Sequence, residues 1–225
     1  MHVKPLNRGR TTRNPTRRDA TFGTGGTLPV WSTLTFRLEA AMKILVVYAS
    51  KHGATQGIAE HIAETLERDG LGVTLKPASD TGPIEEYDAF VIGSAAYMGG
   101  WMDEATTFVR RNRDILAHRP TWLFSSGPTG IGPIDDKGRD MVDSARPKEF
   151  EEFGRTIGPR DQRVFFGAYD PDAPPVGMAE GFMARFMRLA PAIRNALPAG
   201  DFRDWPAIEA WTEEIVQDLV PVGAR

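Results

Sequence analysis

The sequence contains no cysteine, and this absence removes several kinds of chemistry at once. Disulfides, thiolate zinc sites, cysteine-ligated iron–sulfur clusters and a catalytic thiol all require that residue. The four histidines are too scattered to suggest a metal site: His2, His52, His61 and His118. We therefore expect neither a metal centre nor thiol catalysis, and the lack of cysteine fits a reducing compartment.

Long apolar runs are missing as well. No stretch approaches the roughly 18 apolar residues that a membrane-spanning helix needs, and the first residues lack the pattern of a secretory signal peptide. The 225 residues are 41% hydrophobic and 25% charged, which is ordinary for one large folded domain or one domain with extensions. We expect a cytoplasmic protein, with peripheral contact at the inner face of a membrane as the alternative.

Positive charge is concentrated in residues 1–41. This segment holds seven basic and two acidic residues, whereas residues 42–225 hold 20 basic and 28 acidic residues. Because it shows little helical or strand periodicity, we predict a disordered basic extension. Three origins are open: an arm for nucleic acid or membrane, an organelle transit peptide, or an upstream start assignment before a true start at Met42. We favour the last, and expect no nucleic-acid partner.

From Met42 onward, strand and helix signals alternate. Apolar, β-branched or aromatic runs predict five strands, at 43–48, 72–78, 88–95, 121–127 and 162–169. Apolar spacing or capping signals predict helices over 58–66, 105–116, 147–157 and 204–219, the last capped by Asp204 with Pro206 in its first turn. Residues 128–147 read as a loop with one short helix. The alternation predicts an α/β doubly wound parallel sheet with helices on both faces, whose ligand lies at the carboxyl ends of the strands.

The turn Ser50–Thr55 follows the first predicted strand and has the composition of an anion site. Ser50 and Thr55 offer hydroxyl groups, while Gly53 permits a close backbone approach or a positive φ. The helix that follows adds unpaired N–H groups and partial positive charge, which suits a phosphate. The alternative is an ordinary helix-capping turn. No stretch matches G-x-x-x-x-G-K-[ST], and the nearest approach to G-x-G-x-x-G, at Gly23–Thr27, follows no strand, so nucleoside triphosphate and dinucleotide loops are excluded.

Small residues also follow the third and fourth predicted strands. Gly93–Met102 could wrap a flat ligand, with Tyr97, Met98 and Trp101 against its faces or edge. Ser125–Pro133 supplies hydroxyl groups, backbone N–H groups and glycines. Three such loops at one edge of a sheet predict a site for a phosphate and a planar ring.

These loops resemble those of flavodoxin-type FMN-binding domains. The phosphate loop of that family has the form [ST]-x-[ST]-G-x-[ST], and this chain has Ser50-Lys51-His52-Gly53-Ala54-Thr55, with an imidazole where a hydroxyl is usual. The resemblance implies a five-stranded parallel sheet in the order 2-1-3-4-5 and FMN as a resident cofactor, with no catalytic acid, base or metal from the protein. The FMN contacts it implies are Ser50, Lys51, His52, Gly53, Ala54 and Thr55, then Ser94, Ala95, Ala96, Tyr97, Met98 and Gly99, then Ser126, Gly127, Pro128, Thr129 and Gly130.

A closer resemblance, from about Met42 to Leu219, is to the menaquinone-dependent protoporphyrinogen dehydrogenases. It rests on the short phosphate loop, on "VIGSAAYMGG" and "FFGAY", and on a segment inserted at about 170–203, before Asp204-Trp205. It implies a flavodoxin-like domain over 42–221 that is an FMN-dependent oxidoreductase of haem biosynthesis, oxidising protoporphyrinogen IX with a quinone acceptor.

Two other functions are alternatives to that enzyme. One is an electron carrier between protein partners. The other is a flavin-free receiver-type signalling domain, which is disfavoured because Ala49-Ser50 and Gly93-Ser94 occupy the places where receivers need acidic residues.

Within the insertion, residues 178–194 place methionine and phenylalanine broadly on one side of a predicted helix and arginine around the other. This pattern favours contact with an acyl interface, a quinone or an acidic partner, and thus peripheral membrane contact. The alternative is a helix that covers the core and extends its arginines along the surface.

Overall fold

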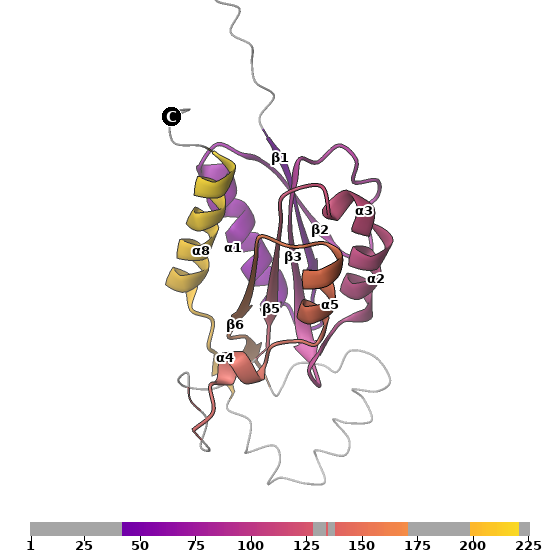
Figure 1. Ribbon diagram of the computed structural model, residues 1–225. Coiled ribbons are helices and arrows are strands. Elements are labelled where there is room, and N and C mark those ends of the chain that lie inside the picture. The colour runs from indigo at the N-terminus through magenta and orange to yellow at the C-terminus, as the bar shows by residue number, and fades with distance from the viewer. Residues whose placement is uncertain (1–41, 128–133, 135–137, 171–198, 221–225) are drawn as a thin grey trace, which may run out of the picture. The chain divides into compact units, whose positions relative to one another are not determined.

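The computed structural model describes residues 42–127, 134, 138–170 and 199–220 (Figure 1). At its centre five parallel strands lie in the order β2-β1-β3-β5-β6. They are β1 (Lys43–Ala49), β2 (Gly72–Pro77), β3 (Ala89–Tyr97), β5 (Thr121–Ser126) and β6 (Asp161–Phe165). The predicted strand order 2-1-3-4-5 is confirmed. The strand numbers differ from the predicted ones because they also count the two-residue β4 (Gly100–Trp101), which pairs with β3 outside this row.

Helices cover both faces of the sheet. In Figure 1, α1 (Ala54–Arg68) and α8 (Trp205–Leu219) lie on one side, and α2 (Asp103–Arg111), α3 (Arg113–Leu116) and α5 (Glu149–Thr156) lie on the other. The short α4 (Met141–Ser144) provides the one helix expected in the loop before α5. No helix in the described ranges is long and apolar enough to cross a membrane.

The core consists of two layers, one on each face of the sheet. Ile44 and Val46 of β1 pack with the helices α1 and α8, whereas Leu45 and Val47 pack with α2 and α5. Successive side chains of a strand point to opposite faces, so a strand buried on both faces needs an uninterrupted apolar run. The sequence "KILVVY" meets that requirement.

The helix predicted over 105–116 is divided at Asn112. The Asn112 side chain donates to the carbonyl of Phe108 at 2.9 Å, and its backbone N–H donates to the same oxygen at 3.1 Å. An asparagine that bonds the preceding turn with its side chain competes with helix continuation. α2 therefore ends before Asn112, and α3 begins after it.

The predicted fifth strand, 162–169, is too long, because β6 ends at Phe165. Phe165 pairs with Ser126, the last residue of β5, so no neighbouring strand remains to continue the ladder. The chain then forms β7 (Ala168–Tyr169), which pairs antiparallel with β8 (Gly200–Asp201). This ribbon joins the described ends of the predicted insertion. The predicted extension over 1–41 and the predicted helix at 178–194 lie outside the described residues.

Candidate functional site

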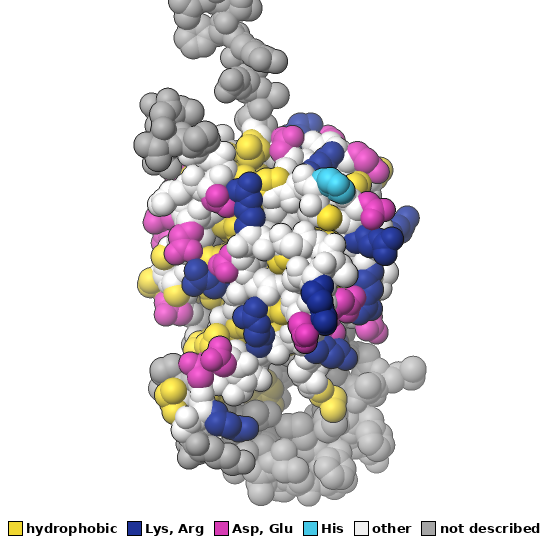
Figure 2. Space-filling model, viewed as in Figure 1, with side chains coloured by type: hydrophobic (Ala, Val, Ile, Leu, Met, Phe, Trp, Pro, Cys, Tyr) yellow, Lys and Arg dark blue, Asp and Glu magenta, His cyan; other side chains and the backbone are white. Residues whose placement is uncertain are grey.

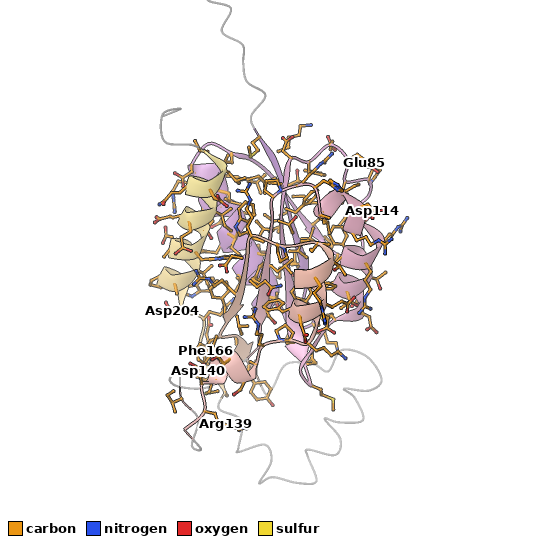
Figure 3. The ribbon with its side chains drawn as sticks, in the orientation of Figure 1. Glu85, Asp114, Arg139, Asp140, Phe166 and Asp204 are labelled. Carbon is orange, nitrogen blue, oxygen red and sulfur yellow. The ribbon has the colours of Figure 1, made fainter. Side chains whose placement is uncertain are left out.

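The carboxyl ends of the parallel strands gather at the lower end of the molecule in Figure 1. In Figure 3, Arg139, Asp140 and Phe166 lie at this end, whereas Glu85 and Asp114 lie at the opposite end. Ligands of doubly wound folds bind at the edge formed by the carboxyl ends of the strands. The candidate site is therefore built from the turns that follow β1, β3 and β5.

The Ser50–Thr55 turn connects β1 to α1 and is closed by its own residues. The backbone N–H of Gly53 donates to the Ser50 hydroxyl at 3.1 Å. Gly53 is the N-cap of α1 and has φ 82° and ψ −13°, a left-handed conformation that favours glycine. Thus Gly53 sets the direction in which α1 leaves the turn, and Ser50 holds that direction.

The N-terminus of α1 is open. No side chain caps it within the described structure, and its first turn holds no acidic residue. Helix geometry leaves the first N–H groups without intrahelical partners and gives this end a partial positive charge. The Thr55 side chain is 1% exposed and sits inside the same turn. An anion is the ligand that these donors suit.

The second turn of the site reverses the chain between β3 and β4. Tyr97 pairs with Gly100, and the two residues between them, Met98 and Gly99, have φ values of 51° and 76°. Two positive φ angles in a two-residue hairpin loop define a type I′ turn. Methionine seldom adopts such a conformation. The turn leaves Met98 fully exposed and Tyr97 41% exposed beside the site.

The first two turns touch each other. The Lys51 ammonium lies 4.6 Å from the centroid of the Tyr97 ring, a cation–π contact. On its other side the hairpin is supported by α5, since the backbone N–H of Lys148 donates to the carbonyl of Gly99 at 3.1 Å. The Ser50–Thr55 turn and the exposed aromatic ring therefore form one continuous surface.

The third turn begins at the end of β5. Ser126 is buried, and the N–H of Gly127 donates to the carbonyl of Phe165 at 3.2 Å. A Cβ placed on Gly127 would lie 3.8 Å from the Cβ atoms of Ala96 and Ala145, so the second and third turns lie side by side. The predicted contacts Pro128, Thr129 and Gly130 fall outside the described residues.

A family comparison identifies this arrangement. A model of the flavodoxin domain matches residues 45–177, which contain the turns after β1, β3 and β5. The chain belongs to the flavodoxin family. The cofactor of this flavodoxin domain is FMN.

Solved flavodoxins are similar to the chain at low identity. Flavodoxin 1 of Bacillus cereus is 16% identical, with 79% of this chain and 99% of that chain covered and a TM-score of 0.46. The Streptococcus pneumoniae flavodoxin is 17% identical, with 78% of this chain and 99% of that chain covered and a TM-score of 0.45. A variant flavodoxin of Pseudomonas aeruginosa is 20% identical, with 56% of this chain and 84% of that chain covered and a TM-score of 0.43.

The side chains of two residues predicted at the ring site are buried and make contacts within the protein. The prediction that Trp101 packs on a ligand is wrong, because Trp101 is 5% exposed and its ring stands 5.6 Å from those of Phe150 and Phe153. The Ser94 hydroxyl is buried, donates to the carbonyl of Ala95 at 2.9 Å and accepts from the N–H of Met102 at 3.1 Å. Ser94 thereby ties the end of the hairpin back to β3.

Glu149 has a supporting role that no sequence pattern predicts. Its carboxylate is buried, accepts from the backbone N–H of Trp101 at 3.0 Å and lies 4.0 Å from the Lys148 ammonium. It therefore fixes β4, on which the Tyr97–Gly100 hairpin depends. In the sequence, Glu149 stands among the acidic residues of "KEFEEF" and nothing separates it from its exposed neighbours.

Proposed function

We propose that the chain is an FMN-dependent oxidoreductase in which the Ser50–Thr55 turn holds the phosphate of FMN. The fit of this turn supports the proposal: it combines a left-handed glycine, a buried threonine and an uncapped helix N-terminus that carries no acidic residue. The proposed phosphate contacts are the residues predicted from the sequence, Ser50, Lys51, His52, Gly53, Ala54 and Thr55. His52 is exposed at the rim, where its ring nitrogens can donate to a phosphate.

The hairpin and the turn after β5 are the proposed ring site. FMN supplies the redox chemistry when bound, while the protein orients it and controls access. Tyr97 and Met98 would border the ring, and Ala95, Ala96 and Gly127 would let the backbone approach it. Ser94 and Ser126 are buried behind this surface and would act by holding the two turns in place.

For the substrates we propose protoporphyrinogen IX as hydrogen donor and a quinone as acceptor. The overall reaction removes hydrogen from the porphyrinogen and adds it to the quinone, giving a quinol. The observation that carries this proposal is that the described ends of the insertion lie beside the proposed ring site. β7 and β8 join its described ends, the N–H of Phe202 donates to the carbonyl of Gly167 at 3.0 Å, and a Cβ on Gly167 would lie 3.1 Å from the Ser126 hydroxyl. Because the described residues on either side of the insertion lie beside Ser126, they support a small-molecule site next to the proposed FMN site.

The second candidate function is electron transfer between protein partners. The exposed side chains of Tyr97 and Met98 favour it, because apolar groups at the rim of a redox site give a partner protein a contact surface. Figure 2 shows basic and acidic side chains interspersed over one face of the described part of the chain.

An anaerobic titration separates the two functions. The purified protein is saturated with FMN, its absorbance spectrum is recorded, and it is mixed first with protoporphyrinogen IX and then with a quinone. We expect bleaching by the donor and recovery of the spectrum by the acceptor. A protein that binds FMN but responds only when a flavodoxin reductase is added is a carrier. A protein that stays colourless after addition of FMN would overturn both functions.

A further inference from the structure

Arg203, which the sequence did not single out, lies against the first turn of α1. Its Nη1 donates to the carbonyl of Ala54 at 3.4 Å, although the two residues are far apart in the chain. Its guanidinium also stacks on the ring of Trp205 at 4.4 Å and is held by the carboxylate of Asp201 through bonds of 2.8 and 2.6 Å. With 18% of its side chain exposed, Arg203 is held by contacts with three elements, β8 through Asp201, α8 through Trp205 and α1 through Ala54.

Gly57 of α1 leaves open the space that this guanidinium occupies. A Cβ placed on Gly57 would lie 2.5 Å from Nη1 of Arg203, closer than atoms of this kind approach each other. Glycine within a helix weakens it, because the backbone of glycine has more freedom to lose than that of any other residue. A first turn that contains Gly57 and begins at Gly53 is therefore locally weak. The contact with Arg203 accounts for a glycine at a position where the helix alone would favour another residue.

The charge of Arg203 stands at an end of α1 that does not favour it. The N-terminus of a helix carries partial positive charge, so cations are stabilised at the opposite end. Asp201 offsets this unfavourable placement, and Arg203 lowers the pKa of Asp201 by hydrogen bonding to its carboxylate. A cation that is kept beside an uncapped helix N-terminus increases the attraction of that end for an anion.

We propose that Arg203 is a positioning residue for the phosphate of FMN. It acts through the first turn of α1: its contacts hold Ala54 and Gly57 in helical geometry, so that the N–H groups of the turn stay directed at the phosphate, and its charge adds to their potential. The inference rests on the FMN site of the proposed function, and it does not depend on which donor or acceptor the protein uses.

The first test compares FMN with riboflavin, which has the same ring without the phosphate. Flavin fluorescence titrations give both dissociation constants for the wild type, Arg203→Ala and Arg203→Lys. We expect Arg203→Ala to weaken FMN binding about tenfold and to leave riboflavin binding unchanged. Arg203→Lys keeps the charge without the planar fork and should recover part of the loss. Equal FMN affinity of the wild type and Arg203→Ala, or equal losses for FMN and riboflavin, would overturn the proposal.

The second test uses Gly57, whose substitution distinguishes the contact with Arg203 from the helix propensity of α1. Gly57→Ala raises the helix propensity of α1 but places a methyl group where the guanidinium lies. We expect this variant to lose FMN affinity about as much as Arg203→Ala does, and to cause no further loss when added to Arg203→Ala, because the two changes remove one shared interaction. Additive losses would contradict the shared mechanism. If Arg203→Ala does not fold, a loss of FMN affinity in Gly57→Ala with riboflavin binding unchanged still supports the proposal, and an unchanged FMN affinity overturns it.

Arg68→Ala is the matched control. Arg68 lies in the last turn of the same helix and also bridges to the α8 side, through an ion pair with Glu209. Its loss should leave both flavin affinities unchanged, and a loss of FMN affinity as large as that of Arg203→Ala would contradict the proposal. Wild-type protein that binds FMN but transfers no electrons would remove the proposed function and leave this inference standing.

Discussion

The helices α1 and α8 have equal lengths of 15 residues and pack on the same face of the sheet, yet they begin in opposite ways. α8 is closed: the Asp204 side chain accepts from the N–H of Ala207 at 3.1 Å, and proline occupies its first turn. α1 begins at the left-handed Gly53 with no side-chain cap and no acidic residue in its first turn.

Among the helices of the described residues, α1 alone has neither a side-chain cap nor an acidic residue in its first turn, which supports its open end as the proposed phosphate site. Even the four-residue α4 is capped, by Asp140, which accepts from the N–H groups of Val142 and Asp143 at 2.8 and 2.9 Å. Capping residues stabilise a helix by satisfying N–H groups that a ligand would otherwise use. In our proposal those groups at α1 remain for the phosphate of FMN.

The largest expected effect comes from adding a negative charge at the start of α1, as Asp204 provides at the start of α8. Ala54→Asp places an acid in the first turn, where it stabilises the helix but repels a phosphate. We expect the apo protein to be at least as stable as the wild type in urea unfolding, and FMN binding to weaken roughly hundredfold. Ala207→Asp, which adds the same charge to the first turn of α8, is the control and should leave FMN affinity unchanged. Undiminished FMN binding by Ala54→Asp would place the phosphate elsewhere.

Thr55→Val tests the hydroxyl inside the open turn. The change keeps the shape of the side chain and removes the hydrogen-bonding group, so FMN binding should weaken by about 1 kcal/mol or more. Thr212→Val makes the same change in α8, where the buried hydroxyl donates to the carbonyl of Ile208 at 2.8 Å. Fluorescence titrations of both variants should show a loss of affinity only at Thr55, and equal affinities would remove Thr55 from the site.

Asp204→Ala tests the closed end of the comparison. Loss of the cap leaves N–H groups of α8 without their partner and should lower the free energy of unfolding by about 1 kcal/mol. Because these groups do not face the FMN phosphate in our proposal, the affinity for FMN should remain that of the wild type once the protein is folded. Urea unfolding and a flavin titration measure the two quantities separately. A free energy of unfolding equal to that of the wild type would show that the Asp204 cap does not stabilise the protein.

The smallest expected effect is a pH dependence from Asp201, beside the open end of α1. Hydrogen bonds from Arg203 lower the pKa of this carboxyl in the folded protein. Its stabilising contribution is therefore fully present above its unfolded pKa of about 3.9, and is lost as the pH falls through the lower folded pKa. The free energy of unfolding, followed by urea titration in this acidic range, should fall less steeply in Arg203→Ala than in the wild type. Parallel curves would show that the pair adds no stability.

Much of the fold could be predicted because its signals are local. Apolar runs marked the five parallel strands, and alternation with helices implied their pairing. The capping of α8 by Asp204 followed from residue type and spacing alone. The errors lie where partners decide: β6 ends at Phe165 because β5 offers no further residue to pair with, and no property of the sequence near Tyr169 announces that β8 will lie beside it.

The candidate site has local and non-local parts in the same way. The Ser50–Thr55 turn is a contiguous motif, and its proposed function depends mainly on neighbouring residues. Trp101 was misplaced because an aromatic residue among glycines looks the same whether it faces a ligand or the core, and here Phe150 and Phe153 bury it. Arg203 was missed because the space it occupies is left open by Gly57, which is distant in the chain.

The sequence by itself determined the order of strands and helices, the open start of α1 and the glycine that sets it, because each depends on residues that are neighbours in the chain. The tertiary structure alone decided which residues surround that start. It brought Tyr97 to Lys51, buried Glu149 beneath the hairpin and laid Arg203 over Gly57. Such pairs form only when the sheet and its crossovers bring distant segments together, and neither partner carries a local signal of the other.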